Sequence, residues 1–180
     1  MQDLSRHDTK VIEELYNKLP EDLKQHSINV ANISKKIACD TKIDSLNAYY
    51  SGLMHDIGKI YIPDIILYKQ DSLTPMEKQI IDFHAFYGYK MLTELGICAD
   101  IAVPVLYSHG FNKPSFEVVP DATISQTKIA QIIKIADIYD ALKSERSYKP
   151  AYDNEQIISI IQNDESINQK FVKSLINMIE

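Results

Sequence analysis

The stretch from Ser51 to Pro63, SGLMHDIGKIYIP, places an ionisable pair, His55 and Asp56, inside an otherwise apolar run. Burying a polar group without a partner costs roughly 2 to 7 kcal/mol, and burying a charge costs more. Something must therefore compensate this pair. The candidates are a hydrogen-bonding partner, a helix end and a metal ion, and the rest of the chain has to decide among them.

The size and charge of the chain limit the classes of function. Its 180 residues predict one domain over residues 1–180, with a motif-bearing core at about 20–153 and C-terminal helices at about 154–180. The composition is that of a globular protein, with 45% hydrophobic residues and a net charge of −6. This acidic balance argues against binding of a nucleic-acid polymer and is compatible with a small anionic ligand.

The cysteines and the N-terminus favour a cytoplasmic protein. Cys39 and Cys98 stand without C-x-x-C spacing, which suits a reducing compartment, and we interpret both as buried apolar thiols. The N-terminus carries charges throughout and lacks the apolar core of a signal peptide. No stretch approaches the ~18 apolar residues of a membrane span, so we expect no membrane association.

Hydrophobic periodicity predicts an all-α fold, because apolar residues recur at steps of three and four along nearly the whole chain. Thr74 and Glu77, with Pro75 between them, form a capping box, whereas residues 110–126 have no period and predict a loop of about 17 residues. Gly58 and Gly96 are the expected helix stops. The helices are expected from Asp8 as cap to about Leu19, from Pro20 past Ile37, from about Ser45 to Asp56, from Thr74 as cap to Gly96, from Asp100 as cap to about His109, from about Thr127 past Asp137, and from near Asn154 and Ser166.

Four of the five histidines lie on different predicted helices, each on the side or end that faces the interior, and two acids join them. A single inward histidine is commonly a hydrogen-bonded core residue, but six such groups would each need a separate buried partner. Gathered around metal ions, they satisfy one another. Imidazoles and carboxylates without thiolates suit Fe, Mn, Zn, Ni or Co. The six candidates are His26, His55, Asp56, His84, His109 and Asp137.

Asp56 is the natural bridge in such a site. It follows His55 at a helix end, where both side chains can reach one centre, and its two oxygens can each bind one ion. Metal ions that share a carboxylate in this way lie roughly 3.5 to 4 Å apart. We therefore expect two divalent ions.

The spacing of these residues resembles a known family. His26, the HD pair and Asp137 in KIADIYDAL resemble the H…HD…D signature of the HD superfamily of metal-dependent phosphohydrolases. HDIGKIYIPDIIL and IADIYDALKSERSYKPA resemble its HD-GYP branch, whose known members hydrolyse cyclic di-GMP. The resemblance covers about residues 20–153 and implies a helical bundle with a metal site between its central helices.

The same resemblance assigns roles to individual residues. It implies that one metal is held by His26, His55, Asp56 and Asp137, and that a second is held by Asp56, His84 and His109. Asp56 and Lys59 become the catalytic residues, and the substrate phosphate is expected to meet Lys59, Arg146 and Lys149. Asp140 is interpreted as a group behind the ligands or a helix cap, and Asp22 as a solvated acid in the first turn of its helix.

One segment departs from the family pattern. In YSHGFNKPSFEVVP, Ser108 stands where the branch has the first of two histidines, Gly110 replaces a glutamate, and the Gly-Tyr-Pro triplet is absent. A hydroxyl is a poor ligand for a transition metal beside imidazole. The resemblance therefore predicts the fold more strongly than the substrate.

Our leading hypothesis is a phosphodiesterase of the cyclic dinucleotide type, acting on a small anionic nucleotide through a metal-activated hydroxide. A degenerate module that binds a nucleotide or a protein without catalysis is one alternative, and a nucleotidase or phosphomonoesterase is another. A helical protein with unrelated core histidines would place His26, His55 and Asp137 far apart. A homodimer and a separate signalling partner both stay open.

Overall fold

The computed structural model describes residues 5–110, 119–144, 152–164 and 167–179, and every regular element among them is a helix. The all-α prediction is confirmed. The helices are α1 (Arg6–Lys18), α2 (Glu21–Thr41), α3 (Ser45–Met54), the 3-10 helix η1 (Ile57–Tyr61), α4 (Asp64–Leu67), α5 (Pro75–Asp82), α6 (His84–Glu94), α7 (Ala99–Tyr107), α8 (Ile124–Lys143), α9 (Asn154–Gln162) and α10 (Gln169–Ile179).

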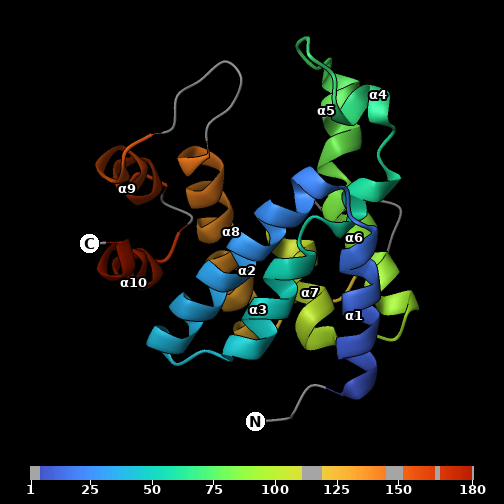
Figure 1. The fold of residues 1–180 in the computed structure, drawn as a ribbon. Helices are drawn as coiled ribbons and strands as arrows, with labels where there is room; N and C mark the ends of the chain where they lie inside the picture. Colours follow the sequence, from blue (N-terminus) through green and yellow to red (C-terminus); the bar gives the residue numbers. More distant parts are fainter. Residues whose placement is uncertain (1–4, 111–118, 145–151, 165–166, 180) are drawn as a thin grey trace.

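Two long helices form the centre of the fold. Helix α2 packs against α3 on one side and α8 on another, and α9 and α10 cover the far side of α8 and α2 (Figure 1). The short helices α4 and α5 project from one end of the bundle (Figure 1). One buried cluster joins α2, α8 and the C-terminal helices, with Ile133 and Phe171 among its members. A second joins α1, α3, α6 and α7, with Met54 and Leu92 among its members.

Small residues let α2 and α3 approach closely. A Cβ atom at Gly52 would lie 3.1 Å from the Cα atom of Ala31, so the two backbones nearly touch there. This contact brings the N-terminal half of α2 beside the end of α3. As a result, the rings of His26 and His55 have their centroids only 5.1 Å apart.

Several helix ends differ from the sequence predictions. The Thr74–Glu77 capping box is present, but α1 is capped by Ser5 rather than by Asp8, because the Ser5 hydroxyl accepts a hydrogen bond from the Asp8 amide. The continuous helix expected after Thr74 is divided at Phe83 into α5 and α6. The remaining corrections are that Pro20 precedes α2 instead of lying in its first turn, that Cys98 rather than Asp100 precedes α7, that α8 begins at Ile124 rather than Thr127, and that α10 begins at Gln169 rather than Ser166.

Two other expectations are wrong. Cys39 and Cys98 are both exposed. Cys39 is in α2 next to the buried Ile37 and Ala38 but on a face of the helix that points to solvent, and Cys98 lies at the start of α7 on the surface. Gly58 does not end α3 but lies inside η1, for a reason given below. Over the residues that the structure describes, no helix is both long and apolar enough to cross a membrane.

Candidate metal centre

The six residues selected from the sequence meet at one place in the bundle. His55 and Asp56 are adjacent, the other four come from separate parts of the chain, and the fold brings all six side chains within a few ångströms of their neighbours. Their positions are His26 in α2, His55 at the end of α3, Asp56 just before η1, His84 at the start of α6, His109 just after α7, and Asp137 in α8.

Asp56 lies in the middle of the cluster and divides it. Its Oδ2 atom lies 3.5 Å from the Nε2 atom of His55 and 3.8 Å from that of His26. Its Oδ1 atom instead lies 3.3 Å from Nε2 of His84 and 3.8 Å from Nε2 of His109. Each oxygen of this one carboxylate therefore faces its own pair of imidazoles.

Asp137 adds a second carboxylate on the side of His26. Its Oδ1 atom lies 3.1 Å from Nε2 of His26 and 3.9 Å from Nε2 of His55, while its Oδ2 atom is 3.7 Å from Nδ1 of His109. Two groups of three residues offer ligand atoms within 4.8 Å of one another. They are His26, His55 and Asp137, and His55, Asp56 and His109.

Backbone carbonyls orient two of the imidazoles toward the centre. Nδ1 of His55 lies 2.8 Å from the carbonyl oxygen of Gly52, and Nδ1 of His84 lies 2.7 Å from that of Ile81. Because a carbonyl only accepts, each Nδ1 donates to it, and each ring turns Nε2 toward the cluster. Metal-binding histidines are held in this way.

The donor atoms fit a divalent cation. Nε2 of His55, Nε2 of His84 and Oδ1 of Asp56 are buried without a hydrogen-bond partner in the described structure, which is costly unless something satisfies them. The donor-to-donor distances around Asp56 and Asp137 run from 3.1 to 3.9 Å. One ion with bonds of 2.0 to 2.2 Å holds its ligands about 3 to 3.5 Å apart, so a small contraction would close the site on it.

His26 is oriented by a side chain rather than by the backbone. Its Nδ1 atom lies 2.7 Å from Oδ2 of Asp140, and the side-chain amide of Asn29 donates to the other oxygen of Asp140 at 2.9 Å. Asp140 thus lies behind His26 rather than at the centre. Asn29 was not selected from the sequence, although its place one helical turn after His26 on the same face of α2 is a signal that could have indicated it.

The electrostatics of the cluster favour ionised acids and two neutral rings. Burial alone would raise the pKa of Asp56, but the neighbouring His55 and Lys59 hold it well below its usual range. Burial also opposes ionisation of Asp137, but the hydrogen bond with His26 and the nearby His55 lower its pKa to about 2. Burial lowers the pKa of His55, and burial together with the adjacent His84 lowers that of His109.

His26 behaves differently from these rings. Burial lowers its pKa, but hydrogen bonds with Asp137 and Asp140 and the nearby Asp56 outweigh burial and raise it to about 9. Without a metal, the ring of His26 is therefore protonated on both nitrogens at neutral pH. The proton on Nε2 has to leave before this atom can act as a ligand.

Helix η1 is seated against the start of α6 through Gly58. A Cβ atom there would collide with the carbonyl oxygen of His84, so this close approach, rather than a helix stop, requires glycine. The turn places Lys59 beside the cluster, where its ammonium group donates to Oδ2 of Asp56 at 2.5 Å. The Lys59 side chain is 22% exposed, so it lies at an open edge of the centre.

Other predicted positions lie off the cluster or outside the described residues. Ser108 is buried, and its hydroxyl donates to the carbonyl oxygen of Val105 at 2.9 Å. Asp22 lies in the first turn of α2 as expected, and its Oδ1 atom is 3.5 Å from the hydroxyl of Tyr68. Arg146 and Lys149 lie outside the described residues.

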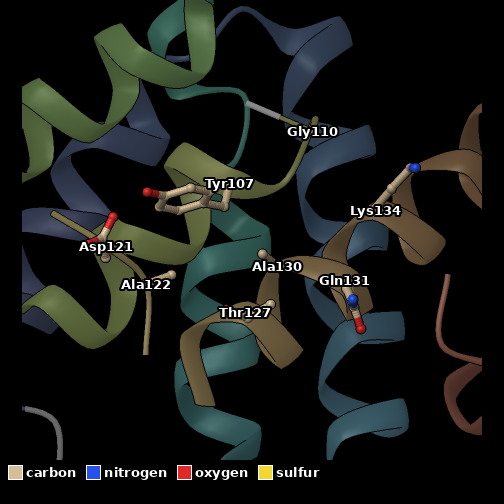
Figure 2. A pocket seen from close by; sticks show the side chains of 8 residues that line it. All are labelled: Tyr107, Gly110, Asp121, Ala122, Thr127, Ala130, Gln131 and Lys134. Carbon is tan, nitrogen blue, oxygen red and sulfur yellow. The ribbon is translucent and has the colours of Figure 1, made fainter. Parts of the chain in front are cut away.

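A cavity of about 520 Å³ lies along α8, beside the end of α7 (Figure 2). Gly110 and Lys134 are among the residues that line it. Gly110 directly follows His109 in the sequence, and Lys134 lies one helical turn before Asp137. Tyr107 and Asp121 form another side of it. Its size is within the usual range for small-molecule pockets.

Comparison with known proteins identifies the family. The family model described as HD domain matches residues 23–142, which is most of the chain and includes all six clustered residues. This chain belongs to the HD domain family. The resemblance found in the sequence motifs is confirmed, and the HD domain supplies the fold in which the histidines and aspartates converge.

The curated relatives of this HD domain are cyclic dinucleotide phosphodiesterases. A 3'3'-cGAMP-specific phosphodiesterase of Vibrio cholerae is 34% identical over 58% of this chain and 20% of its own length. Cyclic di-GMP phosphodiesterases of Pseudomonas aeruginosa and Thermotoga maritima are 30% and 32% identical, over 74% and 69% of this chain and 33% and 35% of their own lengths. The chain thus spans about a fifth to a third of these relatives.

A solved structure has the same fold. The HD domain of the phosphodiesterase PgpH from L. monocytogenes, in complex with cyclic di-AMP, superposes with a TM-score of 0.68 and covers 94% of both chains. The two sequences are 22% identical, so this likeness establishes the helical architecture.

Proposed function

We propose that this HD domain is a metal-dependent phosphohydrolase that cleaves a phosphodiester bond of a cyclic dinucleotide. His26, His55, Asp56 and Asp137 hold one divalent ion, and Asp56, His84 and His109 hold a second. The observation that carries the proposal is the position of the Asp56 carboxylate, whose two buried oxygens face separate pairs of imidazoles. A bridging carboxylate between two ions needs this arrangement.

The chemistry needs no side-chain nucleophile. When bound, divalent ions supply a water whose pKa is lowered toward about 7 and stabilise charge on phosphoryl oxygens. Asp56 would hold the two donor groups together, since one of its oxygens faces each of them. Lys59, at the exposed edge beside Asp56, is the proposed contact for a substrate phosphate. Arg146 and Lys149 are proposed to contact the phosphate as well.

The substrate class is supported by two facts. The curated relatives are named as cyclic di-GMP or cGAMP phosphodiesterases, although they match only over part of their length. The cavity along α8 has the size of a small-molecule pocket, and Gly110 and Lys134 in its lining are close in sequence to His109 and Asp137. The changed segment around Ser108 and Gly110 leaves the choice among cyclic dinucleotides to experiment.

The decisive assay loads the purified protein with Mn or Fe and measures hydrolysis of cyclic di-GMP, cyclic di-AMP and 3'3'-cGAMP. A simple aryl phosphodiester and a nucleoside monophosphate serve as comparison substrates. The proposal expects turnover of at least one cyclic dinucleotide that chelation abolishes and metal restores. Faster turnover of the monophosphate than of any diester would contradict it.

One observation favours a second candidate, a binding module without catalysis. The hydroxyl of Ser108, where the HD-GYP branch has a histidine, donates its hydrogen to the carbonyl oxygen of Val105 at 2.9 Å. A centre with fewer ligands could bind a nucleotide or a protein and not turn it over. Saturable binding of a cyclic dinucleotide, without product from the metal-loaded protein, would support this candidate.

A further inference from the structure

The imidazoles of the cluster are held from behind in two chemically different ways. His55 and His84 each donate from Nδ1 to a neutral backbone carbonyl three residues earlier in the chain. His26 faces a carboxylate instead, with Nδ1 only 2.7 Å from Oδ2 of Asp140. Hydrogen bonds to an ionised acceptor are roughly twice as strong as bonds between neutral groups. The backing of His26 is therefore the strongest of the three.

Asp140 is itself held in place. Its other oxygen accepts a hydrogen bond from the side-chain amide of Asn29 at 2.9 Å, and the residue is buried between α2 and α8. His26 and Asn29 lie one turn apart on the same face of α2 and both contact this carboxylate. Both oxygens of Asp140 thus have a hydrogen-bond partner. The contact with His26 holds the orientation of the imidazole ring and keeps a proton on its Nδ1 atom.

The two donor groups consequently differ in charge. The group of His26, His55 and Asp137 has Oδ1 of Asp137 only 3.1 Å from Nε2 of His26, in addition to the shared Asp56 and the charge of Asp140 behind it. A carboxylate behind a histidine increases its basicity as a ligand. This group should therefore attract a cation more strongly than its neighbour does.

The group of His84 and His109 is less well held. It has one oxygen of Asp56 at 3.3 Å from His84, a neutral carbonyl behind His84, and the second oxygen of Asp137 at the longer distance of 3.7 Å from His109. The side chain of His109 is 27% exposed, and the nearest acid oxygens to its two ring nitrogens lie 3.7 and 3.8 Å away, beyond hydrogen-bond distance. The cost of ordering His109 then has to be met at the moment when an ion binds.

We propose that Asp140, clamped by Asn29, is a positioning residue that makes the two metal subsites unequal. The subsite of His26, His55 and Asp137 fills first and tightly, and the subsite of His84 and His109 fills only at higher metal concentration. This inference rests on the proposed metal centre and goes beyond it, because a two-metal site can equally have matched affinities.

The test is a titration of the metal-free protein with Co²⁺, followed by calorimetry, with native mass spectrometry to count the bound ions. Wild-type protein should show two separate binding steps. Asp140→Asn, which keeps the shape and removes the charge, should weaken the first step about 10- to 100-fold and change the second by less than about threefold. Neither readout depends on hydrolysis.

A matched control is available on the same helix. Asp40→Asn removes the same charge from an exposed position of α2, 14 residues from His26 and therefore about 21 Å away along the helix axis. It should leave both binding steps unchanged. An equal effect of Asp40→Asn and Asp140→Asn would show that net charge alone is responsible, and would overturn the inference.

A double exchange tests the hydrogen-bond chain itself. Combining Asn29→Asp with Asp140→Asn keeps the net charge and lets residue 140 still accept from His26 and donate to residue 29. It should recover most of the affinity lost in Asp140→Asn. Packing alone would not predict this recovery, so a double variant as weak as the single variant counts against the proposal.

The remaining outcomes also decide the matter. Two equal steps in wild-type protein, or equal weakening of both steps by Asp140→Asn, would overturn the inference and leave the proposed function standing. Absence of any metal binding by wild-type protein would overturn the proposed function itself. If Asp140→Asn does not fold, Asn29→Ala decides instead, with an expected weakening of the first step by about fivefold, equivalent to one hydrogen bond.

Discussion

Oδ1 of Asp56 lies 3.3 Å from Nε2 of His84, and both atoms are buried without a hydrogen-bond partner in the described structure. With Nδ1 of His84 donating to a backbone carbonyl, Nε2 is the nitrogen that points at this carboxylate oxygen. A divalent ion between the two atoms would satisfy both of them. The contact is therefore the place where the proposed second metal subsite is tested.

Replacing His84 should remove that subsite and leave the other. We expect His84→Gln to bind one ion in place of two and to lose at least about 100-fold in hydrolysis, since ligands matter more than the outer partners whose loss costs 10- to 100-fold. Metal analysis and turnover of the same samples test this. His7→Gln, at an exposed histidine outside the cluster, is the control. Retention of two ions by His84→Gln would contradict the ligand role.

The protonation of His26 predicts how metal binding depends on pH. Burial lowers its pKa from the ordinary 6.5, but Asp137 and Asp140 raise it to about 9 in the metal-free protein. Its proton must therefore be displaced, so affinity should rise about tenfold per pH unit from pH 7 and level off above about 9. Calorimetry at pH 7.5 in buffers of different ionisation enthalpy should show release of about one proton. An affinity independent of pH across this range would disprove this account of His26.

The close approach at Gly58 predicts a large effect on stability. Gly58→Ala has to displace the backbone of α6 at His84, so we expect the free energy of unfolding to fall by about 3 kcal/mol. Gly110→Ala is the matched comparison, because position 110 has open space around it. There the added methyl group destabilises only through the positive φ of 70°, by about 1 to 2 kcal/mol. Urea denaturation measures both. Equal losses would show that the contact with α6 is not what requires glycine at position 58.

Much of the site could be predicted because its residues follow the helical period. His26 and Asp137 lie on apolar stripes, and the HD pair follows a helix end, so their inward direction is a local property of the sequence. The Thr74–Glu77 capping box is equally local. Such features depend on neighbours within one or two turns, and the structure has them where the pattern predicted.

The features that were missed depend on contacts between distant segments. Asn29 and Asp140 are 111 residues apart, so the position of Asn29 on the His26 face of α2 could have indicated Asn29 itself but not its partner. The need for glycine at position 58 comes from the backbone of α6, which a pattern of helix stops cannot reveal. The exposure of Cys39 and Cys98 likewise follows from which helix faces pack together, and residue type alone predicted the opposite.

Ser108 should be dispensable for metal binding. Its hydroxyl is already paired with the carbonyl oxygen of Val105, so Ser108→Ala removes one local hydrogen bond, at a cost of about 1 kcal/mol, and no ligand. We expect unchanged metal stoichiometry and turnover within about twofold of wild type. Loss of one bound ion in Ser108→Ala would mean that the hydroxyl reorients toward the metal when it binds.

The most direct test of the central claim is the effect of Asp56→Asn on bound metal and on hydrolysis of a cyclic dinucleotide, measured in the same preparation. Asp64→Asn, the same change at an exposed acid of α4, is the control. If Asp56 joins both subsites, Asp56→Asn should lose both ions at concentrations that saturate wild type and reduce turnover by at least about 1,000-fold, while Asp64→Asn behaves as wild type. A folded Asp56→Asn protein that keeps two ions and wild-type turnover would contradict the account.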